Sequence, residues 1–224
     1  MIVLAFDTSL TSCTVGVWQD GVLKAGESAV LPQGHAEALM PMIARVMAAA
    51  AIDYDALDRI AVTVGPGSFT GLRVGIATAR GLAMAAKKPA IGVTTTEALA
   101  AAVLANERHD SSQKILSVID SKRDDVFAQV FAIDGTPITD ILNVGYADLA
   151  TTFPGRMIVT GDATAKALLH LGADALSSLA SPVCTAEHIA AIAAKRDIDP
   201  RGPMPAYVRA PDVTLRPDGG ALRP

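Results

Sequence analysis

The spacing of apolar residues changes along the first half of the chain between the short period of strands and the longer period of helices. Apolar runs bounded by Gly, Asp and Pro predict five strands, at residues 2–6, 13–18, 22–30, 59–64 and 89–93. Helical spacing predicts a helix over residues 35–50, although Pro41 would also allow it to begin one turn later. Two more helices are predicted, at residues 70–86 and after Thr94, where Thr94 and Glu97 have the spacing of a capping box.

The second half of the chain repeats the order found at the start. Asp7-Thr8-Ser9 follows the first strand and leads into a returning strand and an Asp-Gly turn, and Asp120-Ser121-Lys122 does the same before residues 126–133. Two ordinary hairpins would give this pattern too, since Asp and Ser are common turn residues. The offset of about half the chain favours an internal duplication. A strand at 157–160 and helices at 163–171 and 186–196 complete the prediction.

This alternation predicts an α/β fold of two lobes that face each other across a cleft. The most polar stretch, residues 106–112, predicts a boundary that assigns residues 1–108 to one lobe and residues 109–224 to the other. Residues 199–224 hold six of the thirteen prolines. They are expected to form an extended tail, ordered where it docks on a lobe or a partner.

Composition and charge narrow the classes of function. Half of the residues are apolar, but the longest apolar run, residues 98–105, is far shorter than the roughly 20 residues of a membrane span. The first residues are expected to be a core strand rather than a signal peptide. Two distant cysteines, Cys13 and Cys184, support no disulfide framework, which favours the cytoplasm. A net charge of −4 argues against RNA binding by this chain alone.

Polar residues at the ends of predicted strands are candidates for phosphate and magnesium contacts. The carboxylates and hydroxyls of both Asp turns could hold a hydrated magnesium ion, and the amides at a helix N-terminus favour an anion. The candidates are Asp7, Thr8, Ser9, Gly65, Gly67, Ser68, Asp120 and Ser121. A purely structural turn is the competing interpretation. The histidines, His35, His109, His170 and His188, show no metal-ligand spacing, so no metal site is predicted.

Small residues recur at every fourth position of the helix predicted at residues 70–86. They are Gly71, Gly75, Ala79 and Ala83. Such a flat stripe allows close approach of another helix, either within the lobe or across a subunit contact.

Several segments, in order along nearly the whole chain, resemble the TsaB (YeaZ) family, which is related to TsaD within the TsaD/Kae/Qri glycoprotease-like family. They are LAFDTS near the start, GHAE at residues 34–37, GPGSFTGLRVGIATARG at 65–81, IGVTTTEALA at 91–100 and VIDSKRDDVFAQVF at 118–131. The resemblance implies a two-lobed actin-like ATPase (ASKHA, ribonuclease H-like) fold. It also implies a role in N6-threonylcarbamoylation of the adenosine at position 37, beside the anticodon, in tRNAs that read codons starting with A.

The resemblance further implies a scaffold without catalytic residues or a metal. TsaD carries a His-x-x-x-His motif where Thr95 and Leu99 stand here, and neither side chain replaces imidazole as a ligand. Active relatives usually have paired glycines where this chain has Gly161-Asp162, and a carboxylate there would repel phosphate. ATP or ADP with magnesium would then bind at the interface of the complex.

The implied partners are TsaD, as a heterodimer, and TsaE, with tRNA reached through the complex and a homodimer when the chain is alone. The first two helices would pair with those of TsaD through these residues: Leu39, Ile43, Val46, Ala50, Gly71, Gly75, Ala79 and Ala83. Two other functions stay open: a glycoprotease-like metallopeptidase, and a small-molecule kinase that uses Asp7 and Asp120 around magnesium-ATP.

Overall fold

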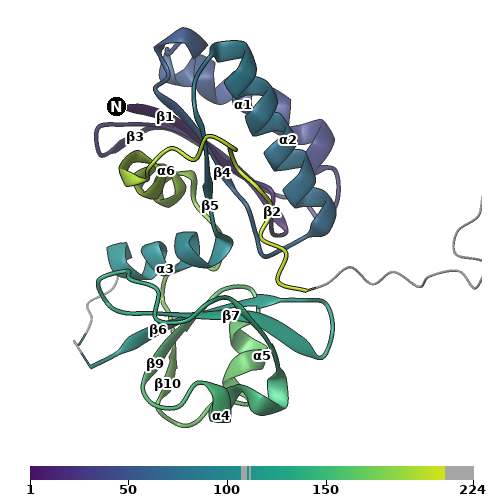
Figure 1. The fold of residues 1–224 in the computed structure, drawn as a ribbon, viewed down its shortest axis with the longest axis vertical. Coiled ribbons are helices and arrows are strands. Elements are labelled where there is room, and N and C mark those ends of the chain that lie inside the picture. The colour runs from purple at the N-terminus through teal and green to yellow at the C-terminus, as the bar shows by residue number, and fades with distance from the viewer. Residues whose placement is uncertain (107–109, 111, 210–224) are drawn as a thin grey trace, which may run out of the picture.

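The computed structural model describes residues 1–106, 110 and 112–209, which form two lobes with a five-stranded sheet in each (Figure 1). The first sheet has the order β3 (Val22–Val30), β2 (Ser12–Gln19), β1 (Ile2–Asp7), β4 (Arg59–Thr63) and β5 (Ala90–Val93). The second has the order β10 (Ala175–Ser177), β9 (Met157–Thr160), β6 (Lys114–Asp120), β7 (Asp125–Phe131) and β8 (Leu142–Gly145). The predicted α/β fold of two lobes is confirmed.

Both sheets have the same internal plan. In the first, β1 pairs antiparallel with β2 and parallel with β4, and in the second, β6 pairs antiparallel with β7 and parallel with β9. The predicted duplication is therefore confirmed. Strands β8 and β10 were not predicted, because they have four and three residues and are mostly exposed, which leaves too few apolar positions for a period.

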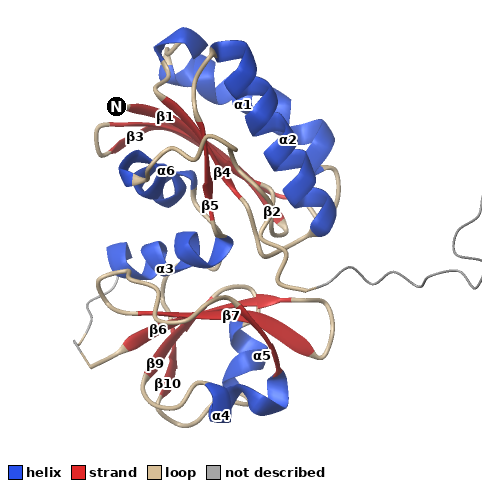
Figure 2. Ribbon diagram, viewed as in Figure 1, coloured by secondary structure: helices blue, strands red, loops and turns tan. Residues whose placement is uncertain are grey.

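Helices cover both faces of the first sheet (Figure 2). On one face lie α1 (His35–Ala50) and α2 (Phe69–Ala86), and on the other lies α6 (Ala186–Lys195). Strand β1 accordingly buries alternate residues on each face: Leu4 and Phe6 join the core under α1, and Val3 and Ala5 join the core under α6. The sequence of a strand that is buried on both faces is a continuous apolar run, as it is at residues 2–6.

The remaining helices belong to the second lobe or lie between the lobes. Helix α3 (Thr95–Asn106) contacts β6, β7 and β9 of the second sheet and also contacts α6 (Figure 2). Helix α4 (Leu149–Thr152) and the short helix α5 (Thr164–Leu168), which ends before the predicted residue 171, pack on the second sheet's other side. No helix in the described ranges is long and apolar enough to cross a membrane.

The two lobes are not consecutive halves of the chain. The boundary predicted between residues 108 and 109 lies outside the described residues. Helix α6 and residues 203–207, which the prediction assigned to the second lobe, pack on the first. The reason is that Ile189, Ala190 and Ala193 cover the sheet face that α1 and α2 leave open. Sequence periodicity shows that a helix has an apolar face but not which sheet the face covers.

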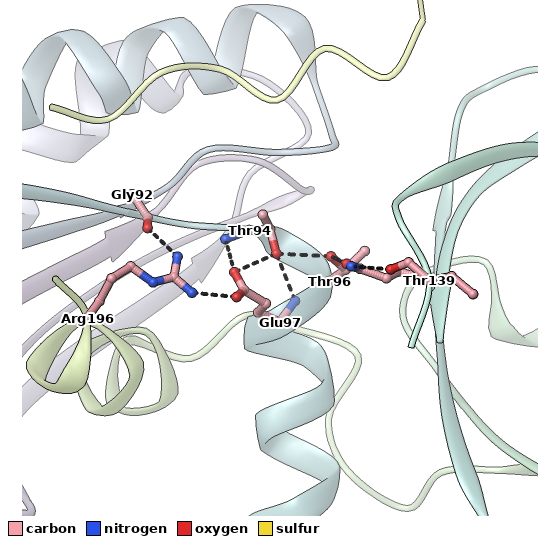
Figure 3. Close-up of polar contacts among 7 residues, drawn as sticks. Gly92, Thr94, Thr96, Glu97, Thr139 and Arg196 are labelled. Atoms are coloured by element: carbon pink, nitrogen blue, oxygen red, sulfur yellow. Dashed lines mark hydrogen bonds and ion pairs between the residues drawn. The ribbon is translucent and has the colours of Figure 1, made fainter. Parts of the chain in front are cut away.

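The start of α3 shows the predicted capping box (Figure 3). The Thr94 N–H donates to Oε2 of Glu97 over 2.8 Å, and the Glu97 N–H donates to Oγ1 of Thr94 over 3.2 Å. This reciprocal pair satisfies two backbone donors that a helix start otherwise leaves open. Helix α1 begins at His35 and accommodates Pro41 in its interior, so the later start is not used.

Candidate functional site: the cleft between the lobes

A cleft of about 1180 Å³ lies between the lobes at the ends of their central strands. The carboxyl ends of parallel strands are where open α/β sheets bind ligands. Several predicted contacts meet there: Ser9, Gly67, Ser68, Asp120 and Ser121. The other three, Asp7, Thr8 and Gly65, are buried and do not line the cleft.

Asp7 is a fully buried carboxylate at the end of β1. Its Oδ1 accepts hydrogen bonds from the Ser9 N–H over 2.9 Å, from the Ser9 hydroxyl and from the Thr63 hydroxyl. Within the part of the chain that the structure describes, its Oδ2 has no hydrogen-bond partner, and neither has the buried Nε2 of His35. Burial raises the pKa of Asp7, although the bonds from Ser9 and Thr63 and the nearby His35 oppose the shift.

Replacing Asp7 by Asn should change how stability depends on pH. A carboxyl whose folded pKa is raised binds more protons in the folded protein than in the unfolded chain. The parent therefore loses stability as pH rises above the ordinary value of 3.8 through the folded pKa. In urea titrations from pH 4 to 8, the free energy of unfolding of Asp7→Asn relative to the parent should increase with pH. A difference that stays constant over this range would contradict the prediction.

The glycine-rich segment before α2 packs directly on the Asp7-Thr8-Ser9 turn. A Cβ at Gly67 would lie 2.3 Å from the Ser9 carbonyl oxygen, and one at Gly71 would lie 2.0 Å from that of Thr8. At Gly75, a Cβ would lie 2.5 Å from Oγ1 of Thr8. These glycines thus allow α2 to approach the turn, which is the packing interpretation of the stripe.

Ser68 is the N-cap of α2 and is not placed as an activated nucleophile. Its Oγ accepts a hydrogen bond from the Gly71 N–H over 3.3 Å, and its own N–H donates to the Ser9 carbonyl over 2.7 Å. This agrees with the competing interpretation of the segment, a purely structural turn.

On the second lobe, Asp162 lines the cleft beside the Asp120 turn. Its Oδ1 accepts the Asp120 N–H over 2.8 Å, and its Oδ2 lies 3.9 Å from Nζ of Lys122. Burial raises the pKa of Asp162, while the Asp120 N–H and Lys122 act against the rise. Ser121 is also engaged, because its hydroxyl donates to the carbonyl of Asp125 over 2.8 Å.

Asp7, the predicted magnesium contact on the first lobe, is fully buried and does not line the cleft. A hydrated magnesium ion in the cleft could reach its Oδ2 only after a local rearrangement. On the second lobe, two carboxylates, Asp120 and Asp162, line the cleft, and Asp162 already accepts the Asp120 N–H that an anion would need.

The side chains predicted as the partner interface mostly point into the first lobe. Leu39, Ile43 and Val46 are at most 3% exposed and belong to the core under α1. Gly71, Gly75 and Ala79 are buried, and Ala50 and Ala83 pack against the same core. A partner could not touch the six buried residues without opening the lobe, whereas Ala50 and Ala83 are half-buried. The interface stays a prediction for the two helices, but it must use their outer faces.

Those outer faces carry small and apolar side chains. Met40 is 46% exposed on α1 and Met84 is 80% exposed on α2. Exposed small residues lie near them on the same helices: Ala44, Ala48, Ala77, Gly81 and Ala85. The helices contact each other and lie side by side (Figure 1). We call these seven residues the α1–α2 face.

One cluster at the cleft was missed by the sequence analysis. The rings of Phe69 and Tyr207 lie 5.9 Å apart, and the Arg73 guanidinium lies 3.8 Å from the centre of the Phe69 ring. Nε of Arg73 also donates to the Tyr207 hydroxyl over 3.3 Å. Tyr207 is far from the other two residues in the sequence, so no local pattern could reveal the cluster.

The two positions that align with the TsaD histidines do not line the cleft. Thr95 and Leu99 are both fully buried, with Thr95 donating to Oγ of Ser9 over 3.1 Å and Leu99 in the core under α6. Among the described residues, no group of three His, Cys, Asp or Glu side chains could hold a metal ion. His109 lies outside the described residues.

The protein belongs to the class in which two lobes of the same plan enclose a cleft. An inorganic polyphosphate/ATP-glucomannokinase from Arthrobacter is similar in fold, with a TM-score of 0.53 at 13% identity over 86% of this chain and 98% of that one. A Pseudomonas aeruginosa protein described as similar to the peptidase YeaZ gives a TM-score of 0.79 at 24% identity, covering 93% and 99% of the two chains. The actin-like ATPase fold is confirmed.

A model of the TsaD family, described as tRNA N6-adenosine threonylcarbamoyltransferase, matches residues 29–167, and the chain belongs to this family. It is 33% identical over 127 residues to the tRNA threonylcarbamoyladenosine biosynthesis protein TsaB of Escherichia coli (strain K12). That alignment covers 57% of this chain and 53% of the relative, so the match spans about half of the TsaB protein. The resemblance to TsaB and YeaZ is confirmed.

Proposed function

We propose that the chain acts in tRNA threonylcarbamoyladenosine biosynthesis as an accessory subunit that docks on a TsaD-type transferase. The observation that carries the proposal is the exposed, apolar α1–α2 face on a member of the TsaD family. Exposed apolar surface of this kind commonly marks a protein interaction site. TsaE would join this pair, and tRNA would be bound through the assembled complex.

The composition of the face suits helix-on-helix docking. Ala44, Ala48, Ala77 and Gly81 have little or no side chain beyond Cβ, so a partner helix can approach closely. Met84 projects from this flat surface and could fill a pocket on the partner, because methionine adapts to irregular gaps. A TsaD partner of the same fold would offer its own first two helices.

An accessory role is also supported by what stands in place of the TsaD histidines. Leu99 has no ligating atom and Thr95 holds the Asp7-Thr8-Ser9 turn through Ser9. A metal at these positions would require unpacking the core between α3 and α6. We therefore assign transfer chemistry to the partner.

Reconstitution tests this proposal directly. Threonylcarbamoyl transfer to tRNA should be measured with TsaD, TsaE, the enzyme that supplies threonylcarbamoyl-adenylate, and ATP, with and without this chain. The complete set should transfer, omission should abolish the product, and the chain alone should give none. Undiminished transfer without the chain would refute the proposal, as would transfer by the chain alone.

Without its partner, the α1–α2 face should be covered by a second copy. Exposed apolar surface favours association, and two-fold dimers are the commonest closed arrangement. Light scattering over a concentration series should show a homodimer that Met84→Glu converts to a monomer. A parent that stays monomeric at high concentration would contradict this.

The isolated chain should bind magnesium-ATP poorly, with nucleotide bound instead at the interface of the complex. Removing the Asp162 carboxylate frees the Asp120 N–H and lowers repulsion of phosphate. Calorimetry should show at least about tenfold tighter ATP binding by Asp162→Ala, equivalent to about 1.4 kcal/mol. Asp134→Ala, which removes an exposed turn aspartate on the second lobe, is the control. Tight ATP binding by the parent would instead favour a kinase.

A further inference from the structure

Residues 202–209, which we call the strap, follow α6 in the chain and run across the first lobe (Figure 1). Arg80 of α2 donates to the Pro203 carbonyl from Nε and Nη2, over 3.1 and 2.7 Å. The Ala206 N–H donates to the Val64 carbonyl over 2.8 Å. Tyr207 packs against Phe69, as described above. The strap is therefore held on the first lobe by backbone, guanidinium and aromatic contacts.

The end of the strap reaches the other lobe. Arg209 donates from Nη2 to Oδ2 of Asp125 and, over 3.2 Å, to Oδ1 of Asn143, and its guanidinium lies 5.7 Å from the centre of the Phe127 ring. The Arg209 and Asp125 side chains are each about three-quarters buried, at 24% and 23% exposure. Residues 206–209 also line the cleft. A partly buried ion pair with a third polar partner holds its geometry better than an exposed pair does.

The segments in which the chain passes from one lobe to the other lie away from the end of the strap. The chain passes from β5 into α3, and later returns to α6 after Cys184, whose Sγ lies 3.7 Å from the Thr95 carbonyl. Both crossings adjoin the contact between α3 and α6. In Figure 1, this contact lies toward the left of the molecule and the end of the strap toward the right.

A polar network at these crossings ties the lobes together (Figure 3). Arg196, after α6, donates to the Gly92 carbonyl over 2.7 Å and also to Glu97. At the start of α3, Thr94 and Thr96 continue the network, and the Thr96 hydroxyl donates to Oε1 of Gln129 on β7. Gln129 in turn donates to the Thr139 carbonyl over 3.0 Å. These bonds make this side of the cleft the natural pivot for any relative motion of the lobes.

We propose that the strap is a latch: Arg209 fastens its end to Asp125 and Asn143, and so holds the cleft at its observed width. Rotation about the pivot that widens the cleft must separate Arg209 from the second lobe, whereas the contacts of Pro203, Ala206 and Tyr207 lie within the first lobe and can persist. The latch rests on contacts within this chain and does not depend on the partner proposed above.

Distance measurements between spin labels on the full chain test the latch. Labels at Gln33→Cys, beside the cleft on the first lobe, and at Ala147→Cys, on the 3₁₀ turn Tyr146–Asp148, report the cleft width. Both positions are exposed, and the two native cysteines are buried. Arg209→Ala should broaden the distance distribution and add a population at longer distances. Arg201→Ala is the matched control, because this exposed arginine pairs with Asp199 near the other end of the strap.

A double-variant cycle assigns the effect to the ion pair. Asp125→Ala should also lengthen the distances, and adding Arg209→Ala to it should change little further, since one contact is lost in both cases. Circular dichroism checks that each variant is folded. Distances in Arg209→Ala that match the parent would overturn the proposal, and so would an equal broadening in Arg201→Ala.

Discussion

Met84→Glu is expected to abolish docking on a TsaD partner while the chain stays folded. Met84 is 80% exposed, so the charged side chain is fully hydrated in the isolated protein. In an apolar helix interface the carboxylate would lose that hydration without gaining a partner. We expect affinity to fall at least about a hundredfold, equivalent to about 2.7 kcal/mol. Calorimetric titration with the TsaD protein of the same organism measures the loss.

Two further variants decide whether the effect belongs to the α1–α2 face. Leu169→Glu places the same charge at a position 81% exposed on the second lobe and should leave affinity unchanged. Met84→Leu keeps the apolar volume and should bind almost as well as the parent. Equal losses from both glutamate variants, or none from Met84→Glu, would remove the face from the docking site.

Gly71→Ala is expected to be the most destabilising single-methyl change in the first lobe. The new Cβ would stand 2.0 Å from the Thr8 carbonyl oxygen, a distance that no rotamer can relieve because both atoms are fixed by the backbone. The Thr8 hydroxyl also donates to the Gly71 carbonyl over 2.7 Å, and any shift of α2 strains that bond. Overpacking of this kind costs about 3 kcal/mol. Urea unfolding gives the loss.

Gly81→Ala is the matched control on the same helix. A Cβ there would have no atom of the described residues within 4 Å, and the residue is exposed. Alanine is favoured over glycine in a helix interior by about 1 kcal/mol, so this variant should be slightly more stable than the parent. If Gly71→Ala unfolds at the same urea concentration as the parent, the close packing between α2 and the Thr8 turn is not a determinant of stability.

The stripe of small residues on α2 shows what the sequence of a helix can predict and what it leaves open. The four-residue spacing correctly predicted one flat face on α2, and it left open whether the lobe or a partner would cover that face. Gly71 and Gly75 lie against Thr8, whereas Ala77 and Gly81 face outward with nearly the same spacing. Alanine and glycine carry too little hydrophobic contrast to show which side of a helix is buried.

In the candidate site, too, some features were predicted from the sequence and others were not. The Asp7 and Asp120 turns were predicted from the local sequence, because the residue types that favour a turn lie within a few positions of it. The contacts that hold the strap, Tyr207 on Phe69 and Arg209 on Asp125, join residues more than 80 positions apart and have no local signal. The packing of α6 on the first sheet was not predicted, for the same reason.

The chain's own sequence determined the strand and helix periods, the duplicated plan and the capping box at Thr94, since each depends on neighbours along the backbone. Only the tertiary structure decided that α6 covers the first sheet, that Leu39 and Ile43 face inward, and that the strap crosses the cleft. Local geometry sets the period of an element, but the surface it buries depends on which complementary faces remain uncovered once the whole chain is packed.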